Sequence, residues 1–80
     1  MTLKQRLLPT YRVLQPGRDE RYVCSWFRTE LRKHGIERSR VTVSVWLHGR
    51  GQPSDPEAVE GVVRVLEADA EIEATRRYHG

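Results

Sequence analysis

The side chains best suited to nucleophilic or metal chemistry are few and scattered along the chain. Cys24 is the only cysteine, so neither an internal disulfide nor a Cys-pair metal site can form. Its neighbours Val23, Trp26 and Phe27 indicate a buried and unreactive thiol. His34, His48 and His79 show no ligand spacing, and we therefore expect no metal site.

Patterns typical of enzymes are also missing. Gly49-Arg50-Gly51 lacks the later glycine and the lysine of a phosphate-binding loop. The acidic residues at 67, 69, 71 and 73 fit the solvated face of a helix rather than a pair of catalytic carboxylates. We therefore expect a binding protein without catalytic residues and without a cofactor.

Charge points to the chemistry of a partner instead. Residues 1–51 contain eleven Lys and Arg against four Asp and Glu, whereas residues 52–80 contain three against seven. A basic amino-terminal part with an acidic tail suggests a face that binds a polyanion, although an ordinary solvated helix surface explains the charges equally well.

The length of the chain restricts its organisation. Eighty residues make a single domain over 1–80, and self-association is a common way for such a small core to grow. Apolar runs are too short for a membrane span. The first residues carry Lys4 and Arg6 where a signal peptide would be apolar, and this predicts a cytoplasmic protein.

Two helices are predicted in the first half of the chain. Residues 3–14 have apolar side chains at helical spacing, but Pro9 predicts either a kink there or a helix that ends early, with 11–14 extended. Asp19 is a plausible cap for a second helix that runs to about His34, where Gly35 supplies a stop.

Residues 40–48 allow two structures. Apolar and polar residues alternate almost perfectly, and the valines favour a strand. A helix fits as well, because Val43 and Leu47 lie one turn apart and Ser39 can cap it. The preferred fold is mostly α, a bundle of four to five short helices, and the alternative is an α+β fold with 40–48 as a strand.

The last helix has the clearest signals. Ser54 or Asp55 can cap it, Pro56 suits its first turn, and an apolar stripe runs from Val59 to Ala70. A pause at Asp69 is possible before the helix continues to about residue 77.

Residues Val43 to Gly51, followed by Pro53 and a helix from Asp55, resemble the Cro and phage-repressor class of helix-turn-helix proteins. The resemblance covers roughly residues 19–68. Gly35 and Gly49 lie fourteen residues apart, two more than is usual in that class, so the turn between the helices would be longer.

The resemblance implies a sequence-specific regulator that binds double-stranded DNA, of the small phage or mobile-element repressor type. A recognition helix from Ser39 to His48 would lie in the major groove. The base-reading residues would be Arg40, Thr42 and Ser44. The phosphate-binding residues would be Arg32, Lys33, Arg38, His48 and Arg50.

One such helix covers few base pairs, and a homodimer on a two-fold site is therefore expected. The last helix carries apolar side chains away from its main stripe, and these predict the dimer interface: Val65, Ile72 and Tyr78.

An alternative function is a small accessory or inhibitor protein that binds another protein through residues 40–48 and the acidic last helix. A helix at 40–48 favours the DNA partner, and a strand favours the protein partner. Binding of single-stranded RNA would require exposed aromatic residues, and those of this chain fit a core better.

Overall fold

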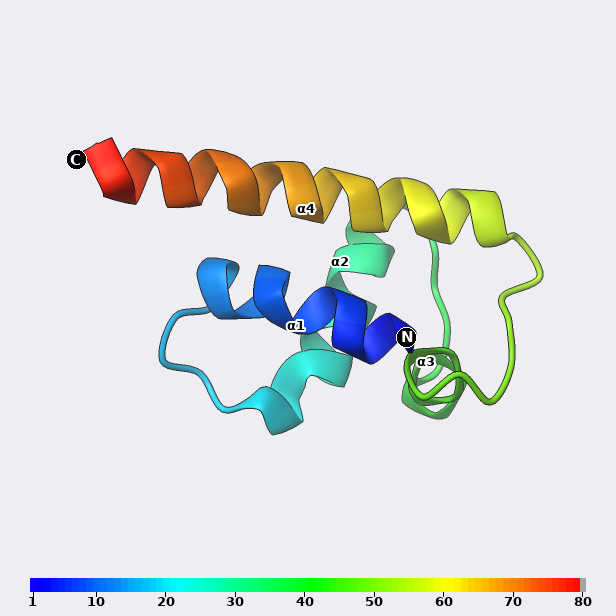
Figure 1. Ribbon diagram of the computed structural model, residues 1–80. Coiled ribbons are helices and arrows are strands. Elements are labelled where there is room, and N and C mark those ends of the chain that lie inside the picture. Colours follow the sequence, from blue (N-terminus) through cyan, green and yellow to red (C-terminus); the bar gives the residue numbers. More distant parts are fainter. Residues whose placement is uncertain (80) are drawn as a thin grey trace.

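The computed structural model describes residues 1–79, which form four α-helices and one short 3₁₀-helix and contain no strand (Figure 1). The predicted helical fold is confirmed, and the alternative with a strand at 40–48 is wrong. The elements in chain order are α1 (Leu3–Leu14), η1 (Glu20–Tyr22), α2 (Val23–Lys33), α3 (Arg40–Leu47) and α4 (Pro56–His79).

Helix α1 continues through Pro9, so the prediction that it ends early is wrong. It begins with a capping box, in which the Thr2 side chain accepts from the Gln5 backbone and Gln5 bonds back to Thr2. Proline removes only one intrahelical hydrogen bond. The burial of Leu7 and Tyr11 on the inner face of α1 outweighs that loss.

Helix α2 begins later than predicted, because one 3₁₀ turn comes first. The Asp19 carboxylate accepts a hydrogen bond from the Arg21 amide and starts this turn. The predicted stop at Gly35 is confirmed, since the Ile36 amide donates to the Leu31 carbonyl across the helix end at 2.9 Å. Residues 34–39 then lead to α3.

Helix α3 forms in spite of the strand propensity of its valines. The Ser39 side chain accepts from the Thr42 amide at 3.2 Å and caps the helix. Gly49 closes the other end at φ 72°, a backbone conformation that L side chains rarely adopt. The helix buries Val43, Trp46 and Leu47 together, whereas a strand would turn Trp46 to the opposite face.

Helix α4 runs without a pause at Asp69 and packs on α1 (Figure 1). The Asp55 carboxylate accepts from the Ala58 amide at 3.2 Å and caps it, as predicted. At its other end, Arg77 donates to the Val13 carbonyl of α1 at 2.7 Å. None of the helices within residues 1–79 has the length and apolar character needed to cross a bilayer.

A half-buried ion-pair network joins α1 to α4. The Arg6 guanidinium donates to the Glu60 carboxylate at 2.7 Å and to the Glu67 carboxylate at 2.9 Å. The hydrogen bonds to Glu67 and then Glu60 raise the pKa of Arg6 above its ordinary value, so this cation keeps its charge at every practical pH. Helices α1 and α4 consequently hold a fixed relative position.

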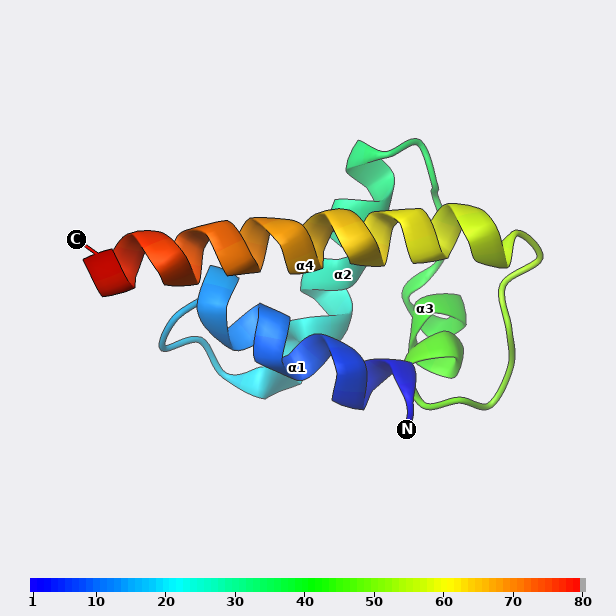
Figure 2. The ribbon, with the colours of Figure 1, turned by 45° about the horizontal axis from the view of Figure 1, so that its top comes forward.

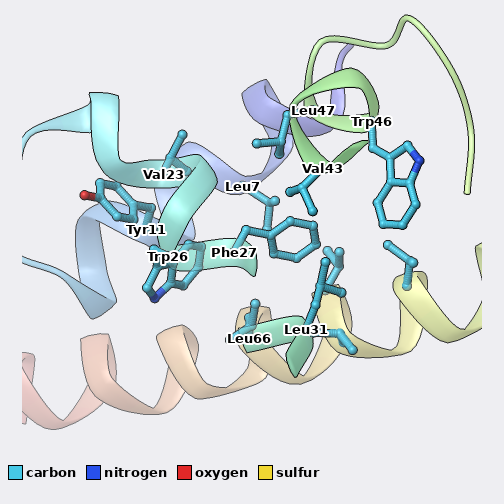
Figure 3. Close-up of a cluster of buried hydrophobic side chains, with 13 residues drawn as sticks. Leu7, Tyr11, Val23, Trp26, Phe27, Leu31, Val43, Trp46, Leu47 and Leu66 are labelled. Atoms are coloured by element: carbon cyan, nitrogen blue, oxygen red, sulfur yellow. The ribbon is translucent and has the colours of Figure 1, made fainter. Parts of the chain in front are cut away.

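Phe27 lies at the centre of the core, fully buried between α1, α3 and α4 (Figure 3). Leu7 and Val43 approach it from α1 and α3, and both are also fully buried. Tyr11 packs edge-on against Trp26 with ring centroids 5.3 Å apart, and its hydroxyl donates to the Asp19 carbonyl at 2.7 Å. Burial raises the pKa of the Tyr11 phenol, which keeps it a neutral donor.

Replacing Phe27 with Ala is expected to lower the free energy of unfolding by about 3–5 kcal/mol, because a large side chain is lost and a cavity remains. That loss is comparable with the whole stability of a small domain. Urea unfolding followed by circular dichroism measures it. The control Gln52→Ala removes an exposed loop side chain and is expected to change stability by less than about 0.5 kcal/mol. Equal midpoints for the two variants would contradict this description of the core.

Candidate nucleic-acid interface

The outer face of α3 forms a shallow groove of about 310 Å³. Its lining comes from α3 and from the turn that follows it: Arg40, Val41, Ser44, Val45, His48 and Arg50. The predicted contact residues Arg40, Ser44, His48 and Arg50 therefore share one surface.

The core decides which side chains of α3 face this groove. Val43, Trp46 and Leu47 point inward (Figure 3), and helical geometry then turns Val41 and Val45 outward. Val41 is 74% exposed. The middle of the groove is thus apolar, and its ends carry Arg40 and Arg50.

The turn after α3 approaches the helix closely at Gly51. A Cβ atom at this position would lie 2.9 Å from the Val45 Cγ1 atom, closer than side chains pack. Glycine therefore lets the 49–51 segment lie against Val45, and this places Arg50 at the edge of the groove.

A second, smaller depression of about 190 Å³ adjoins the groove, and Arg40, Ser44 and His48 line both. Lys4 at the start of α1 and Arg21 just before α2 also line it. The Cys24 thiol, half-buried rather than fully buried as predicted, donates to the Arg40 carbonyl at 3.6 Å and joins α2 to the first turn of α3. Glu20 lines this depression as well, but its carboxylate pairs with Arg12. Three segments of the chain thus contribute to one continuous surface on which cations predominate.

The cations of this surface differ in how far they are already neutralised. Within residues 1–79, Lys4, Arg40 and Arg50 form no ion pair, whereas Arg21 lies 3.8 Å from Asp19. Most arginines elsewhere pair with a nearby carboxylate, as Arg12 does with Glu20. The charges of Lys4, Arg40 and Arg50 therefore remain available to an anionic ligand.

Four predicted contact residues lie away from the groove. Thr42 is about 160° around α3 from both Arg40 and Ser44, and its hydroxyl accepts from the Ser39 hydroxyl at 3.0 Å. Arg38 lines a different depression, together with Trp46 and Pro53.

Arg32 and Lys33 lie at the far end of α2. Arg32 is 3.7 Å from Glu37, and Lys33 is 3.1 Å from Glu30. Their charges are thus partly satisfied by their own segment, and they do not extend the groove.

The sequence interpretation missed Val41, Val45, Lys4 and Arg21 as members of this surface. A signal for the valines was present, because Val41 and Val45 lie opposite Val43 and Leu47 once the segment is taken as a helix. No comparable signal existed for Lys4 and Arg21, whose positions depend on how α1 and α2 pack beside α3.

Comparison of the chain with protein-family models, with curated proteins and with solved structures finds no match. The chemistry of the surface must therefore carry the functional argument. An exposed helix with an apolar centre, a hydroxyl and unpaired cations at its rim can bind a ligand that combines anionic groups with apolar and hydrogen-bonding edges.

Replacing Gly51 with Ala is expected to displace Val45 and to destabilise the protein by about 1 kcal/mol, because the new Cβ overlaps the Val45 methyl group. Methyl NMR of Val45 and urea unfolding report the two effects. The control Gln52→Ala changes the neighbouring exposed side chain and is expected to leave both the Val45 methyl signal and the stability nearly unchanged. An unshifted Val45 methyl signal in Gly51→Ala would contradict the close approach.

Proposed function

We propose that this protein binds double-stranded DNA sequence-specifically, with α3 in the major groove. The observation that carries the proposal is the outer face of α3, where the unpaired Arg40 lies beside the exposed Val41 and the half-buried Val45. An α-helix with its side chains is about 10–12 Å in diameter, which suits a major groove about 12 Å wide.

The side chains of this face match the groups that base pairs present in the major groove. An arginine can donate two hydrogen bonds to the O6 and N7 atoms of guanine, and this is the role proposed for Arg40. The methyl groups of Val41 and Val45 suit the thymine methyl group, and the Ser44 hydroxyl can donate or accept. Thr42 has no place in this set, because it lies on another side of α3.

Phosphate contacts would come from the rim. Lys4, Arg21, His48 and Arg50 surround the outer face of α3 from three segments of the chain. Such contacts supply affinity and salt dependence but carry no sequence information. Arg32, Lys33 and Arg38 are left out of this set because they lie elsewhere.

The arrangement of charge supports the same proposal. Most acidic residues after position 52 belong to α4, which lies across the body of the protein from α3 (Figure 1). DNA on the outer face of α3 would therefore avoid the acidic helix. The resemblance to Cro-type proteins suggests in addition that DNA binding serves transcriptional regulation, as in a small phage or mobile-element repressor.

The competing proposal of a protein-binding module loses its main support. It required a strand at 40–48 with an edge open to a partner, and these residues form a helix instead.

Selection of random duplexes by the purified protein, followed by sequencing, is expected to enrich one short motif. Arg40→Ala is expected to weaken binding to that motif by roughly ten- to hundredfold, because a bidentate base contact is lost. The control Arg32→Ala removes the same charge at the far end of α2 and is expected to have a much smaller effect. Loss of binding in both variants alike would leave only a non-specific basic surface, and failure to retain DNA at low salt would refute the proposal.

A further inference from the structure

A second exposed stripe runs along the outer face of α4, opposite to the face that packs on the core. Its members alternate at spacings of four and three residues: Gly61, Val65, Ala68, Ile72 and Thr75. Val65 is 44% exposed and Ile72 is 61% exposed. This is the spacing of the contact seam of a coiled coil, with Val65 and Ile72 at the a positions and the small residues at the d positions.

The seam is hollowed where its small residues lie. A depression of about 540 Å³ adjoins Gly61, and another of about 350 Å³ lies between Ala68 and Thr75, next to Ile72. A helix packed here could therefore approach the α4 backbone closely, and its side chains would fill these hollows.

The residues that flank the seam carry charges of both signs. Arg64 and Glu71 occupy the g positions on one side, and Asp69 and Arg76 occupy the e positions on the other. Asp69 and Glu71 have no ion-pair partner in the described part of the chain. Arg64 and Arg76 have only long contacts, 3.7 Å to Glu60 and 3.5 Å to Glu73.

We propose that a second copy of this chain packs on this face, with the two α4 helices parallel and in register. In a parallel pair each g residue meets the e′ residue five positions later on the other helix. Arg64 then meets the partner's Asp69, and Glu71 meets the partner's Arg76. By symmetry four complementary pairs form, and Val65 and Ile72 each pack against their own copies.

An antiparallel pair is less well satisfied. It sets g residues against g′ residues and e residues against e′ residues. In the register that joins Arg64 to the partner's Glu71, Asp69 then faces the copy of Val62 on the other helix, which is buried in its own core and offers no charge. Of the predicted interface residues, Val65 and Ile72 belong to this seam, whereas Tyr78 lies beyond its last member.

The parallel arrangement determines where the two outer faces of α3 point. Val43 and Trp46 point from α3 toward the side on which α4 lies (Figure 3), so the outer face of α3 points away from α4. In Figure 1, α4 lies along one side of the molecule, and α3 lies toward the other side, beside the amino-terminal end of α1. Figure 2 also shows α3 beside that end of α1. A two-fold axis along the paired α4 helices therefore turns the two α3 grooves in opposite directions.

Such a dimer would join two separate duplexes rather than bind both halves of one short two-fold site. This consequence rests on the proposed DNA binding, whereas the pairing of α4 does not. The two-fold site expected from the resemblance would then be replaced by single sites on two DNA segments.

Sedimentation velocity over a range of micromolar concentrations tests the pairing without DNA. The wild-type protein is expected to dimerise. Arg64→Glu and Asp69→Arg are each expected to weaken the dimer by roughly tenfold, because two attractive pairs become repulsive. The combined variant R64E/D69R is expected to restore it. Arg18→Glu, the same charge change in an exposed turn, is the control and is expected to leave the dimer intact.

A monomer at all concentrations, or a combined variant weaker than either single one, would overturn the pairing. Circular dichroism of each variant confirms that the helices remain, so loss of folding cannot imitate loss of the dimer.

Capture of a fluorescent duplex by a duplex fixed on beads tests the opposed grooves, with the selected motif in both. The wild-type protein is expected to bridge the two, and Arg64→Glu is expected to bind one duplex but bridge much less. A dimer that binds DNA without bridging would overturn the opposed grooves. A dimer that binds no DNA would refute the proposed function but not the pairing of α4. A monomer that binds DNA would refute the pairing but not the proposed function.

Discussion

The packing of the inner face of α3 against Phe27 is the interaction on which the rest of this structure depends. Eight residues are too few for a stable isolated helix, and those of α3 favour extended structure by their local propensity. Burial of Val43 and Leu47 in the core stabilises the helical form. The same burial fixes the rotation of α3, and the rotation decides that Arg40, Val41, Ser44 and Val45 share the outer face.

Much of the fold was predictable from local signals. Caps at Ser39 and Asp55 and the glycine stop at Gly35 mark helix ends in the residues themselves, and the structure confirms all three. The choice between helix and strand at 40–48 was not local, because it depends on which side chains the neighbouring helices bury. Pro9 left two alternatives open for the same reason, since the core holds Tyr11 in a helix that local chemistry could end.

The candidate site was predictable only in part. The resemblance to Cro-type proteins implied Arg40, Ser44, His48 and Arg50, and the structure brings these four together. Thr42 was chosen by its chemistry, but helical rotation sets it on another side. Arg32 and Lys33 were chosen by charge alone, and charge does not tell which cations pair with a carboxylate of their own segment. Lys4 belongs to the surface because α1 packs beside α3, and no local sequence pattern predicts that packing.

Opposite sides of the molecule thus carry different chemistry. The surface around α3 gathers cations that have no carboxylate partner, whereas the outer face of α4 combines an apolar seam with charges of both signs. The first suits a polyanion, and the second suits a copy of itself. Helix α1 connects the two sides, since Arg6 holds α4 while Lys4 reaches the surface beside α3.

Titration of the ¹⁵N-labelled protein with a duplex, followed by amide chemical shifts, tests the central claim most directly. The account predicts that the largest changes fall on residues 40–51 and near Lys4 and Arg21, while the amides of α4 beyond Leu66 change little. Changes concentrated on α4, or spread evenly over the surface, would contradict the claim that the outer face of α3 binds DNA.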